Sequence, residues 1–287
     1  VRSVGLVAVE SEDTIIPRIM KAELNYATGL LRIFVSETVD LTPSSRLNTS
    51  LIQIRNDSVS EKGTFRLVNS TVVSADGLVI NISLTELQRA NSIKTSGTSG
   101  GDGIANLVTV LDNAFHDIGL NMNNFTSNIT LEESDDNVAP ILDYGLFNLS
   151  TGILQLYFKE TIRVETSSYF SGVLYNLSRL YISNTSSDRT LPLHKSVLLE
   201  KDATEISMQL SEVERVASIL RSGTHGGDGA SVTLSMDTRA FVDVALNAIN
   251  AVANIHVTEF RDTVRPVAVS AKLLLGTGVL IVTFSEV

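Results

Sequence analysis

One stretch of the chain has residue types and spacing suited to nucleophilic catalysis. Gly97-Thr98-Ser99-Gly100-Gly101 fits the G-x-S-x-G pattern, in which a strained turn between a strand and a helix exposes a serine. Here the expected order is reversed, with a helix before the loop and a strand after it. A second loop, Gly223-Thr224-His225-Gly226-Gly227, keeps the glycines but has histidine in place of the serine. We therefore interpret both loops as glycine-rich connectors and expect no enzymatic activity.

The histidines and cysteines indicate no transition-metal site. The chain contains no cysteine, which excludes zinc-thiolate sites and disulfides. No two histidines are spaced to share a helical face, so we expect all four to be solvated or to lie on strand faces. They are His116, His194, His225 and His256.

A group of acidic residues offers the hard oxygen ligands that calcium prefers. Its members are Glu132, Glu133, Asp135 and Asp136. The run from Asp135 to Pro140 also resembles the calcium-binding linker of cadherins, but a mid-domain Asp-x-Asp and a Leu-Asp-Arg-Glu motif are missing. A calcium ion at this position is one hypothesis, and a solvated, charged hinge is the other.

The pattern Asn-x-Ser/Thr is the clearest indication of cellular location. Nine of the nineteen asparagines fit it: Asn48, Asn56, Asn69, Asn81, Asn124, Asn128, Asn148, Asn176 and Asn184. Such sequons accept N-linked glycans in secreted eukaryotic proteins. Chance occurrence in a chain rich in serine and threonine is the alternative. We predict an extracellular or cell-surface glycoprotein, with glycans expected first at Asn81 and Asn148.

The elements that position these residues are organised around a ten-residue phrase that occurs three times, at 28–37, 151–160 and 277–286. Each copy begins with Thr-Gly, continues with alternating residues and ends with glutamate. A period of two predicts a strand with one face in the core. A proline precedes each Thr-Gly pair by eleven positions, with spacings of 123 and 126 residues: Pro17, Pro140 and Pro266. This period is typical of one ordinary domain.

We therefore divide the chain into tandem repeats. Residues 13–135 and 136–261 are two complete repeats, and 262–287 opens a further one. Residues 1–12 match the end of the second complete repeat, so we expect the last strand of a preceding repeat there. The ends would then be covered either by further covalent chain or by strands exchanged with neighbouring chains.

Each complete repeat contains about seven short strand signals and one helix signal. The helix signals are capping boxes at Thr85–Gln88 and Ser211–Glu214. Spacing predicts that Leu84, Leu87 and Asn91 form the inner stripe of the first helix, with Leu210, Val213 and Ala217 in the second. The pattern as a whole predicts an all-β chain of antiparallel sandwiches with one short helix per repeat.

Phe284-Ser285-Glu286-Val287 resembles the TFSE-V strand of immunoglobulin-like repeats in surface-layer proteins and large adhesins. Those repeats often start with Asp-Thr-x-x-Pro, as in 262–266, and end with an Asp-x-x-Gly-Asn turn, which is degenerate here at 117–121 and 243–247. The resemblance covers both full repeats and implies immunoglobulin-like sandwiches in an extracellular, elongated, structural or adhesive array. With its sequons, the chain resembles the glycoproteins of protist surface fibres and flagellar hairs (mastigonemes).

The composition of the chain limits the kinds of partner that it can bind. A net charge of −10 argues against nucleic acid and anionic membrane surfaces, and no apolar run approaches the roughly 18 residues of a membrane span. We expect a structural segment of a long extracellular glycoprotein fibre or adhesin, with neighbouring copies of the chain as partners. N-linked glycans, and Ca²⁺ under the calcium hypothesis, are the only groups expected. The alternative is a calcium-dependent cell-adhesion module that binds a protein or glycan.

Overall fold

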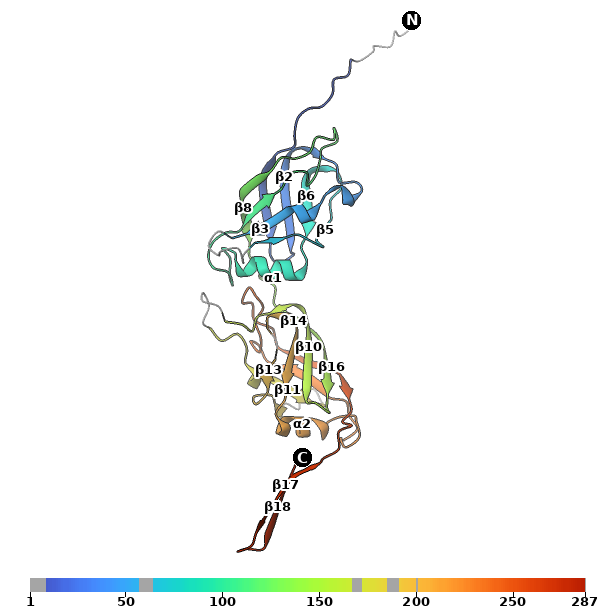
Figure 1. The fold of residues 1–287 in the computed structure, drawn as a ribbon, viewed down its shortest axis with the longest axis vertical. Coiled ribbons are helices and arrows are strands. Elements are labelled where there is room, and N and C mark those ends of the chain that lie inside the picture. Colours follow the sequence, from blue (N-terminus) through green and yellow to red (C-terminus); the bar gives the residue numbers. More distant parts are fainter. Residues whose placement is uncertain (1–8, 57–63, 167–171, 185–190, 200, 287) are drawn as a thin grey trace. The chain divides into compact units, whose positions relative to one another are not determined.

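The computed structural model describes residues 9–56, 64–166, 172–184, 191–199 and 201–286 of the 287-residue chain. The described part consists mainly of β-strands, with one short α-helix in each half (Figure 1). The prediction of an all-β chain is confirmed. The chain divides into two compact units, Val1–Asn137 and Val138–Val287, called unit 1 and unit 2 below.

The helix of unit 1, α1 (Glu86–Lys94), lies across one end of the strands (Figure 1). Two short 3-10 turns, η1 (Ser44–Arg46) and η2 (Thr49–Leu51), precede the third strand. The strands are β1 (Ile19–Asn25), β2 (Leu30–Val39), β3 (Ile52–Arg55), β4 (Phe65–Arg66), β5 (Thr71–Val72), β6 (Gly77–Ser83), β7 (Leu107–Val110) and β8 (Thr126–Ser134).

Hydrogen bonds join the strands of unit 1 in the order β4-β3-β7-β8-β1-β2-β6-β5. Neighbouring strands are antiparallel except β1 and β8, which run parallel with Ala22 opposite Leu131. The expectation of an entirely antiparallel sheet is therefore wrong at this pair. Parallel neighbours need a long connection between them. Here β1 is the first strand and β8 the last, so the rest of the unit forms that connection.

Unit 2 has the same strand order, β12-β11-β15-β16-β9-β10-β14-β13, in which every label is eight higher than in unit 1. The first and last strands of this sheet, β9 and β16, again form the parallel pair. Its helix is α2 (Glu212–Ile219), and its 3-10 turn is η4 (Leu177–Arg179). The strands are β9 (Leu142–Asn148), β10 (Ile153–Ile162), β11 (Leu180–Ser183), β12 (Leu191–Pro192), β13 (Val197–Leu198), β14 (Ala203–Gln209), β15 (Thr233–Met236) and β16 (Val252–Phe260).

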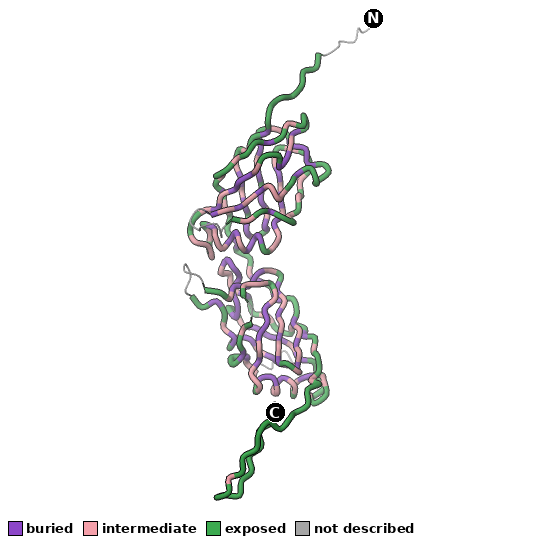
Figure 2. The backbone as a smooth tube through the Cα atoms, in the orientation of Figure 1, coloured by how far each residue is buried: buried purple, intermediate pink, exposed green. Residues whose placement is uncertain are grey.

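The hairpin that contains the repeated phrase has one register in all three copies. Ala22 lies opposite Ile33 in β1–β2, and Gly145 lies opposite Leu156 in β9–β10. In the last copy, β17 (Ala268–Leu274) pairs with β18 (Val279–Phe284), and Ala271 lies opposite Val282. The residues of this last hairpin are mostly exposed (Figure 2).

The segment 1–12, expected to be a closing strand, lies mostly outside the described residues. Its described part, 9–12, is exposed and forms no strand (Figure 2).

Alternation along the strands predicted the core faces correctly. Leu31 and Ile33 in β2, and Leu154 and Leu156 in β10, are 0% exposed. The same holds for the inward residues of β6 and β14, which are Ile80, Ile82, Ile206 and Met208. Hydrophobic burial of this kind is the main stabilising contribution to such a fold.

The prediction for the inner face of the helices is wrong at its central positions, although Leu84 and Leu210, which precede the two helices, are buried as predicted. Leu87 is 70% exposed and Val213 is 66% exposed, whereas Arg89 and Arg215 are buried. The helices turn charged residues inward because the cluster described below satisfies them. No helix among the described residues has the length and apolar character needed to cross a membrane.

Candidate functional site

Both helices begin with the predicted capping box, and this sets which residues face inward. In α1, Thr85 Oγ1 accepts the N–H of Gln88, and the Gln88 side chain accepts the N–H of Thr85. Ser211 and Glu214 make the same reciprocal pair in α2. The reciprocal bonds satisfy donors that a helix start otherwise leaves unpaired. An arginine follows immediately in both helices.

Arg215 is the centre of a charged cluster in unit 2. Its Nε and Nη2 donate to the two carboxylate oxygens of Glu212 at 2.7 and 2.8 Å. Nη1 donates to the carbonyl of Leu149 at 2.9 Å and to Asp262 at 2.7 Å, and Nη2 donates to Glu286 at 3.0 Å. The arginine side chain is 6% exposed. One guanidinium therefore joins the helix, the turn after β9 and the segment that carries β17 and β18.

The charges in this cluster reinforce one another. Hydrogen bonds to Glu212 and then to Asp262 raise the pKa of Arg215 above its ordinary value, against the opposing effect of burial. Burial by itself would raise the pKa of Asp262. Hydrogen bonds from the N–H of Val264 and from Arg215 outweigh that effect, so the pKa of this carboxyl is lowered. Both partners are charged at neutral pH.

Arg89 has the same arrangement in unit 1. Its Nε and Nη2 donate to Glu86 at 2.6 and 2.9 Å. Its Nη1 donates to the carbonyl of Tyr26 at 3.1 Å and to Asp136 at 2.6 Å. The side chains of Arg89 and Asp136 are 8% and 1% exposed. Hydrogen bonds between two charged groups, as Arg89 makes to Glu86 and Asp136, are among the stronger ionic contacts in proteins.

The Thr-Gly turn of the repeated phrase packs against these arginines. Gly29 has a φ of 65° and Gly152 a φ of 71°, in the region that favours glycine. A Cβ on Gly29 would lie 3.4 Å from Cδ of Arg89, and a Cβ on Gly152 would lie 3.2 Å from Cδ of Arg215. The positive φ therefore accounts for the glycine at both positions, and at Gly152 the arginine stem adds a tight contact.

No protein-family model matches the chain, and no curated protein matches it. The clusters around Arg89 and Arg215 are therefore interpreted from their own chemistry. Their repetition in two units that share one topology is the strongest indication that they have a role.

Reasoning from sequence missed these arginines, although a signal was present. Residues 85–89 read Thr-Glu-Leu-Gln-Arg and residues 211–215 read Ser-Glu-Val-Glu-Arg. The capping box accounts for the first and fourth positions only. The shared Glu-x-x-Arg pair within it is the i, i+3 spacing that brings opposite charges together on a helix.

Three of the four acidic residues suggested for calcium have separate partners. Glu132 is exposed and lies 3.5 Å from Lys21. Asp135 is exposed, and Asp136 pairs with Arg89 as described above. Glu133 accepts the backbone N–H of Gly97 at 2.8 Å. A calcium ion shared by this set remains a prediction that no observation tests.

Glu133 also holds a buried polar pair in unit 1. It accepts the hydroxyl of Tyr26 at 2.6 Å, and Asn106 Nδ2 donates to that hydroxyl at 2.9 Å. Burial, and then the charge of Glu133, raise the pKa of Tyr26 above its ordinary value. In unit 2 the corresponding glutamate, Glu259, accepts the N–H groups of Gly223 and Val232 at 3.1 and 2.6 Å. Leucine and valine replace the tyrosine and asparagine there, at 149 and 232.

The two glycine-rich loops form turns that are closed by backbone hydrogen bonds. Gly101 N–H donates to Thr98 O at 3.1 Å, and Gly227 N–H donates to Thr224 O at 3.1 Å. A Cβ on Gly101 or Gly227 would lie 2.1 Å from a backbone oxygen, so neither position admits a side chain. The loops therefore keep their glycines for steric reasons, in agreement with their interpretation as connectors.

Three carboxylates in unit 1 come together although they are far apart in sequence. Oxygens of Asp13, Glu37 and Asp117 all lie within 4.8 Å of one another. Asp117 is 1% exposed and accepts the backbone N–H and the Nδ2 of Asn121 at 2.8 and 2.9 Å. The turn from Asp243 to Asn247 in unit 2 has the same two hydrogen bonds. Both turns therefore have one geometry despite their different sequences.

Most sequon asparagines are accessible, and one is not. The exposed ones are Asn48, Asn69, Asn124 and Asn128. The half-buried ones are Asn81, Asn148, Asn176 and Asn184. Asn81 lies on the outer face of β6, as expected, but its Oδ1 is buried without a hydrogen-bond partner. Asn148 uses Oδ1 to accept the N–H groups of Ser150 and Thr151.

Asn56 is only 3% exposed. Its Nδ2, the atom that a glycan would modify, donates to the carbonyl oxygens of Thr95 and Ile104 and to Asp102. A glycan on this atom is incompatible with the folded arrangement. We therefore expect Asn56 to carry no glycan in the folded chain, unlike the other asparagines of the predicted set.

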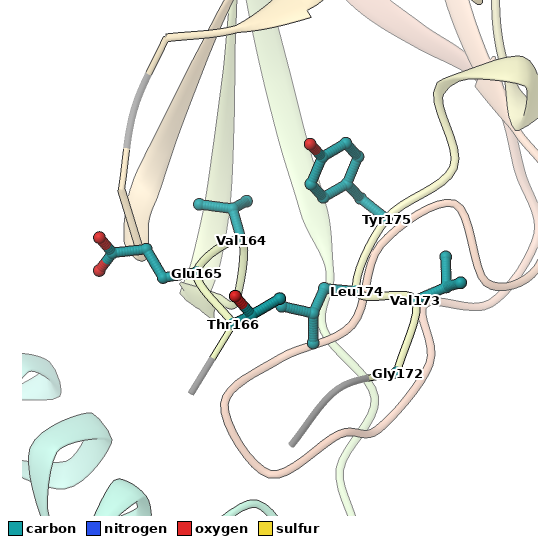
Figure 3. Close-up of a pocket in the computed structure, with 7 residues that line it drawn as sticks. All are labelled: Val164, Glu165, Thr166, Gly172, Val173, Leu174 and Tyr175. Atoms are coloured by element: carbon teal, nitrogen blue, oxygen red, sulfur yellow. The ribbon is translucent and has the colours of Figure 1, made fainter. Parts of the chain in front are cut away.

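The histidines do not gather. His116 is half-buried with Nδ1 2.8 Å from the carbonyl of Asp117, and His194, His225 and His256 are exposed. A surface hollow of about 660 Å³ lies between 164–166 and 172–175, and the carboxylate of Glu165 points away from Tyr175 (Figure 3). The residues between those segments are outside the description, so we base no site on this hollow.

Proposed function

We propose that the chain is a structural segment of a long extracellular glycoprotein fibre or adhesin built from tandem immunoglobulin-like β-sandwich repeats. The arginine clusters carry the proposal. In each unit the helix arginine binds an aspartate, Asp136 or Asp262, that closely follows β8 or β16. A largely buried, hydrogen-bonded ion pair at this point restrains the chain where it leaves the eight-stranded sheet, which suits an array in which every repeat must pass tension to the next.

The shared topology supports tandem repeats. Units 1 and 2 have one strand order, and the hairpin register is kept a third time in β17–β18. A repeat that contacts only its neighbours allows an array to be extended without a new fold. We assign neighbouring copies of the chain as its partners within the fibre.

The surface supports the extracellular assignment. Four exposed sequons, together with the half-buried ones, present asparagines to solvent, and N-linked glycans would solubilise and space a fibre. The G-x-S-x-G loop is accounted for by turn geometry, so we assign no enzymatic activity.

Electron microscopy of the native material, labelled with an antibody raised against unit 1, tests this proposal. We expect label along filaments at a regular spacing. Label confined to isolated, compact particles would overturn it.

A calcium-dependent cell-adhesion module is the second candidate, and the grouping of Asp13, Glu37 and Asp117 favours it. Calcium would then raise the melting temperature of the chain relative to a sample in chelator. Identical melting in the two buffers would remove this candidate.

A further inference from the structure

The carboxylates Asp13, Glu37 and Asp117 carry more negative charge than their surroundings balance. Within the part of the chain that the structure describes, no ion pair joins any of the three to a cation. Oε1 of Glu37 is buried and has no hydrogen-bond partner. Burial, and then the charges of Asp117 and Asp13, raise the pKa of Glu37. A group in this state is suited to receive a cation.

The equivalent residues in unit 2 show which cation fits. Asp262 precedes Pro266 by four positions, as Asp13 precedes Pro17, and Glu286 ends the repeated phrase as Glu37 does. Asp262 and Glu286 both bind one guanidinium, that of Arg215, at 2.7 and 3.0 Å. The same two positions of the repeat are therefore seen with an arginine bound.

We propose that Asp13, Glu37 and Asp117 form a binding site for the guanidinium group of an arginine. This arginine is the last residue of a Thr/Ser-Glu-x-Gln/Glu-Arg helix start in another repeat of the same kind, placed ahead of Asp13. The inference rests on the proposed function, because it requires that repeats follow one another. A planar guanidinium presents five donors in a fixed fork, enough to bind its own helix glutamate, a turn carbonyl and carboxylates of the following repeat.

The site gives the array a direction. Each repeat offers an arginine at its helix and carboxylates near its first hairpin, so that one end of a repeat is complementary to the opposite end of the next. Two arginine ends or two carboxylate ends would place like charges together, which disfavours a reversed junction. Only head-to-tail order leaves every arginine paired.

The test compares the 287-residue chain with an extended chain, in which residues 138–261 are placed ahead of Asp13 instead of residues 1–12. Arg261 then joins Asp13 as it joins Asp262 in the natural order. The added unit supplies its own buried core and its own Arg215. Hydrogen exchange of peptides covering β1 and β2, measured by mass spectrometry, reports the stability of this part of unit 1.

We expect Glu37→Gln to have opposite effects in the two chains. In the 287-residue chain it removes a half-buried carboxylate that two neighbouring carboxylates repel, so exchange in β1 and β2 slows. In the extended chain it removes an acceptor of the guanidinium, so exchange becomes faster. In the extended chain, Arg215→Gln in the added unit should likewise speed exchange in β1 and β2. When Arg215→Gln is already present there, adding Glu37→Gln should not speed exchange further. Asp135→Asn is the matched control, because Asp135 is an exposed carboxylate outside the group of Asp13, Glu37 and Asp117. Its effect on exchange should be the same in the 287-residue chain and in the extended chain.

Two outcomes would overturn the inference. If Glu37→Gln changes exchange in the same direction in both chains, no arginine occupies the site. If calcium chloride slows exchange in the 287-residue chain but not in its Glu37→Gln variant, the carboxylates hold a metal ion instead. The fibre proposal would survive the first outcome, because the microscopy of native filaments does not depend on this contact.

Discussion

Arg215 donates to Asp262 at 2.7 Å across 47 residues of sequence, and both side chains are largely withdrawn from solvent. Arg89 and Asp136 are separated by the same 47 residues and lie 2.6 Å apart. In both units the pair joins a helix to the chain that follows the eight-stranded sheet, after β8 in unit 1 and after β16 in unit 2. The contact is long-range and ionic, so it can be tested by substitution and by pH.

Arg89→Gln should lower the free energy of unfolding of unit 1 by about 3 kcal/mol, because it leaves the buried carboxylate of Asp136 without its guanidinium. Urea unfolding measures the change. Arg32→Gln is the matched control, since Arg32 is 51% exposed and lies 3.8 Å from Glu23, and it should cost less than about 1 kcal/mol. Equal costs for the two variants would contradict the buried role of Arg89.

Acid should release the pair between Arg215 and Asp262. The pKa of Asp262 is lowered in the folded state, so its stabilising contribution is complete above the ordinary aspartate value of 3.8. The contribution is lost as the pH falls below that value and through the lower folded value. Hydrogen exchange of α2 and β17 across this range measures the loss. In Asp262→Asn the acid dependence from this carboxyl should disappear, and its persistence would exclude Asp262 as the source.

Gly101→Ala should destabilise unit 1 by about 1–3 kcal/mol, because the new Cβ would lie 2.1 Å from the carbonyl oxygen of Ser96. Gly77→Ala is the control, since the nearest atom to its Cβ would be 3.9 Å away and its φ is not positive. It should change stability by no more than about 1 kcal/mol. Thermal melting of the two variants decides the matter, and a harmless Gly101→Ala would refute the steric account of the loop.

Replacing Tyr26 and Asn106 together by the leucine and valine found in unit 2 should cost less stability than the two single replacements suggest. Tyr26→Leu alone leaves Asn106 Nδ2 without the hydroxyl it donates to, and Asn106→Val alone removes a donor to the tyrosine. The double variant copies Leu149 and Val232. We expect its cost to be smaller than the sum of the single costs by about 0.5–3 kcal/mol in a double-mutant cycle. Additive costs would show that the two residues are not coupled.

Glycan mapping should separate the sequons by burial. When the chain is secreted from a eukaryotic host, glycosidase treatment followed by peptide mass analysis should find glycans at Asn48, Asn69 and Asn124. Asn56 should be unmodified, because its Nδ2 is buried and bonded to backbone oxygens. A fully glycosylated Asn56 would mean that modification precedes folding there or that this part of the fold differs.

Sequence alone determined the features that depend on near neighbours along the chain. Alternation in the repeated phrase placed Leu31 and Ile33 on the core face, because successive strand side chains point to opposite sides. The capping boxes at Thr85 and Ser211 were likewise predictable, since both partners lie within one helical turn. The equal register of the three hairpins follows from the equal turn at Thr-Gly.

Only the tertiary structure decided which distant residues meet. The spacing of apolar residues placed Leu87 on the core-facing side of its helix, yet Leu87 is 70% exposed. The buried face is instead occupied by Arg89 and its partners. Asp136 lies 47 residues beyond that arginine, and β1 pairs in parallel with the last strand of its unit. Asn56 fits the Asn-x-Ser/Thr pattern as well as the other sequon asparagines do, but the loop at 95–104 packs against it and buries it. The spacing of residues along the chain cannot predict these contacts, because each one joins segments that are distant in sequence and meet only when the sheet folds.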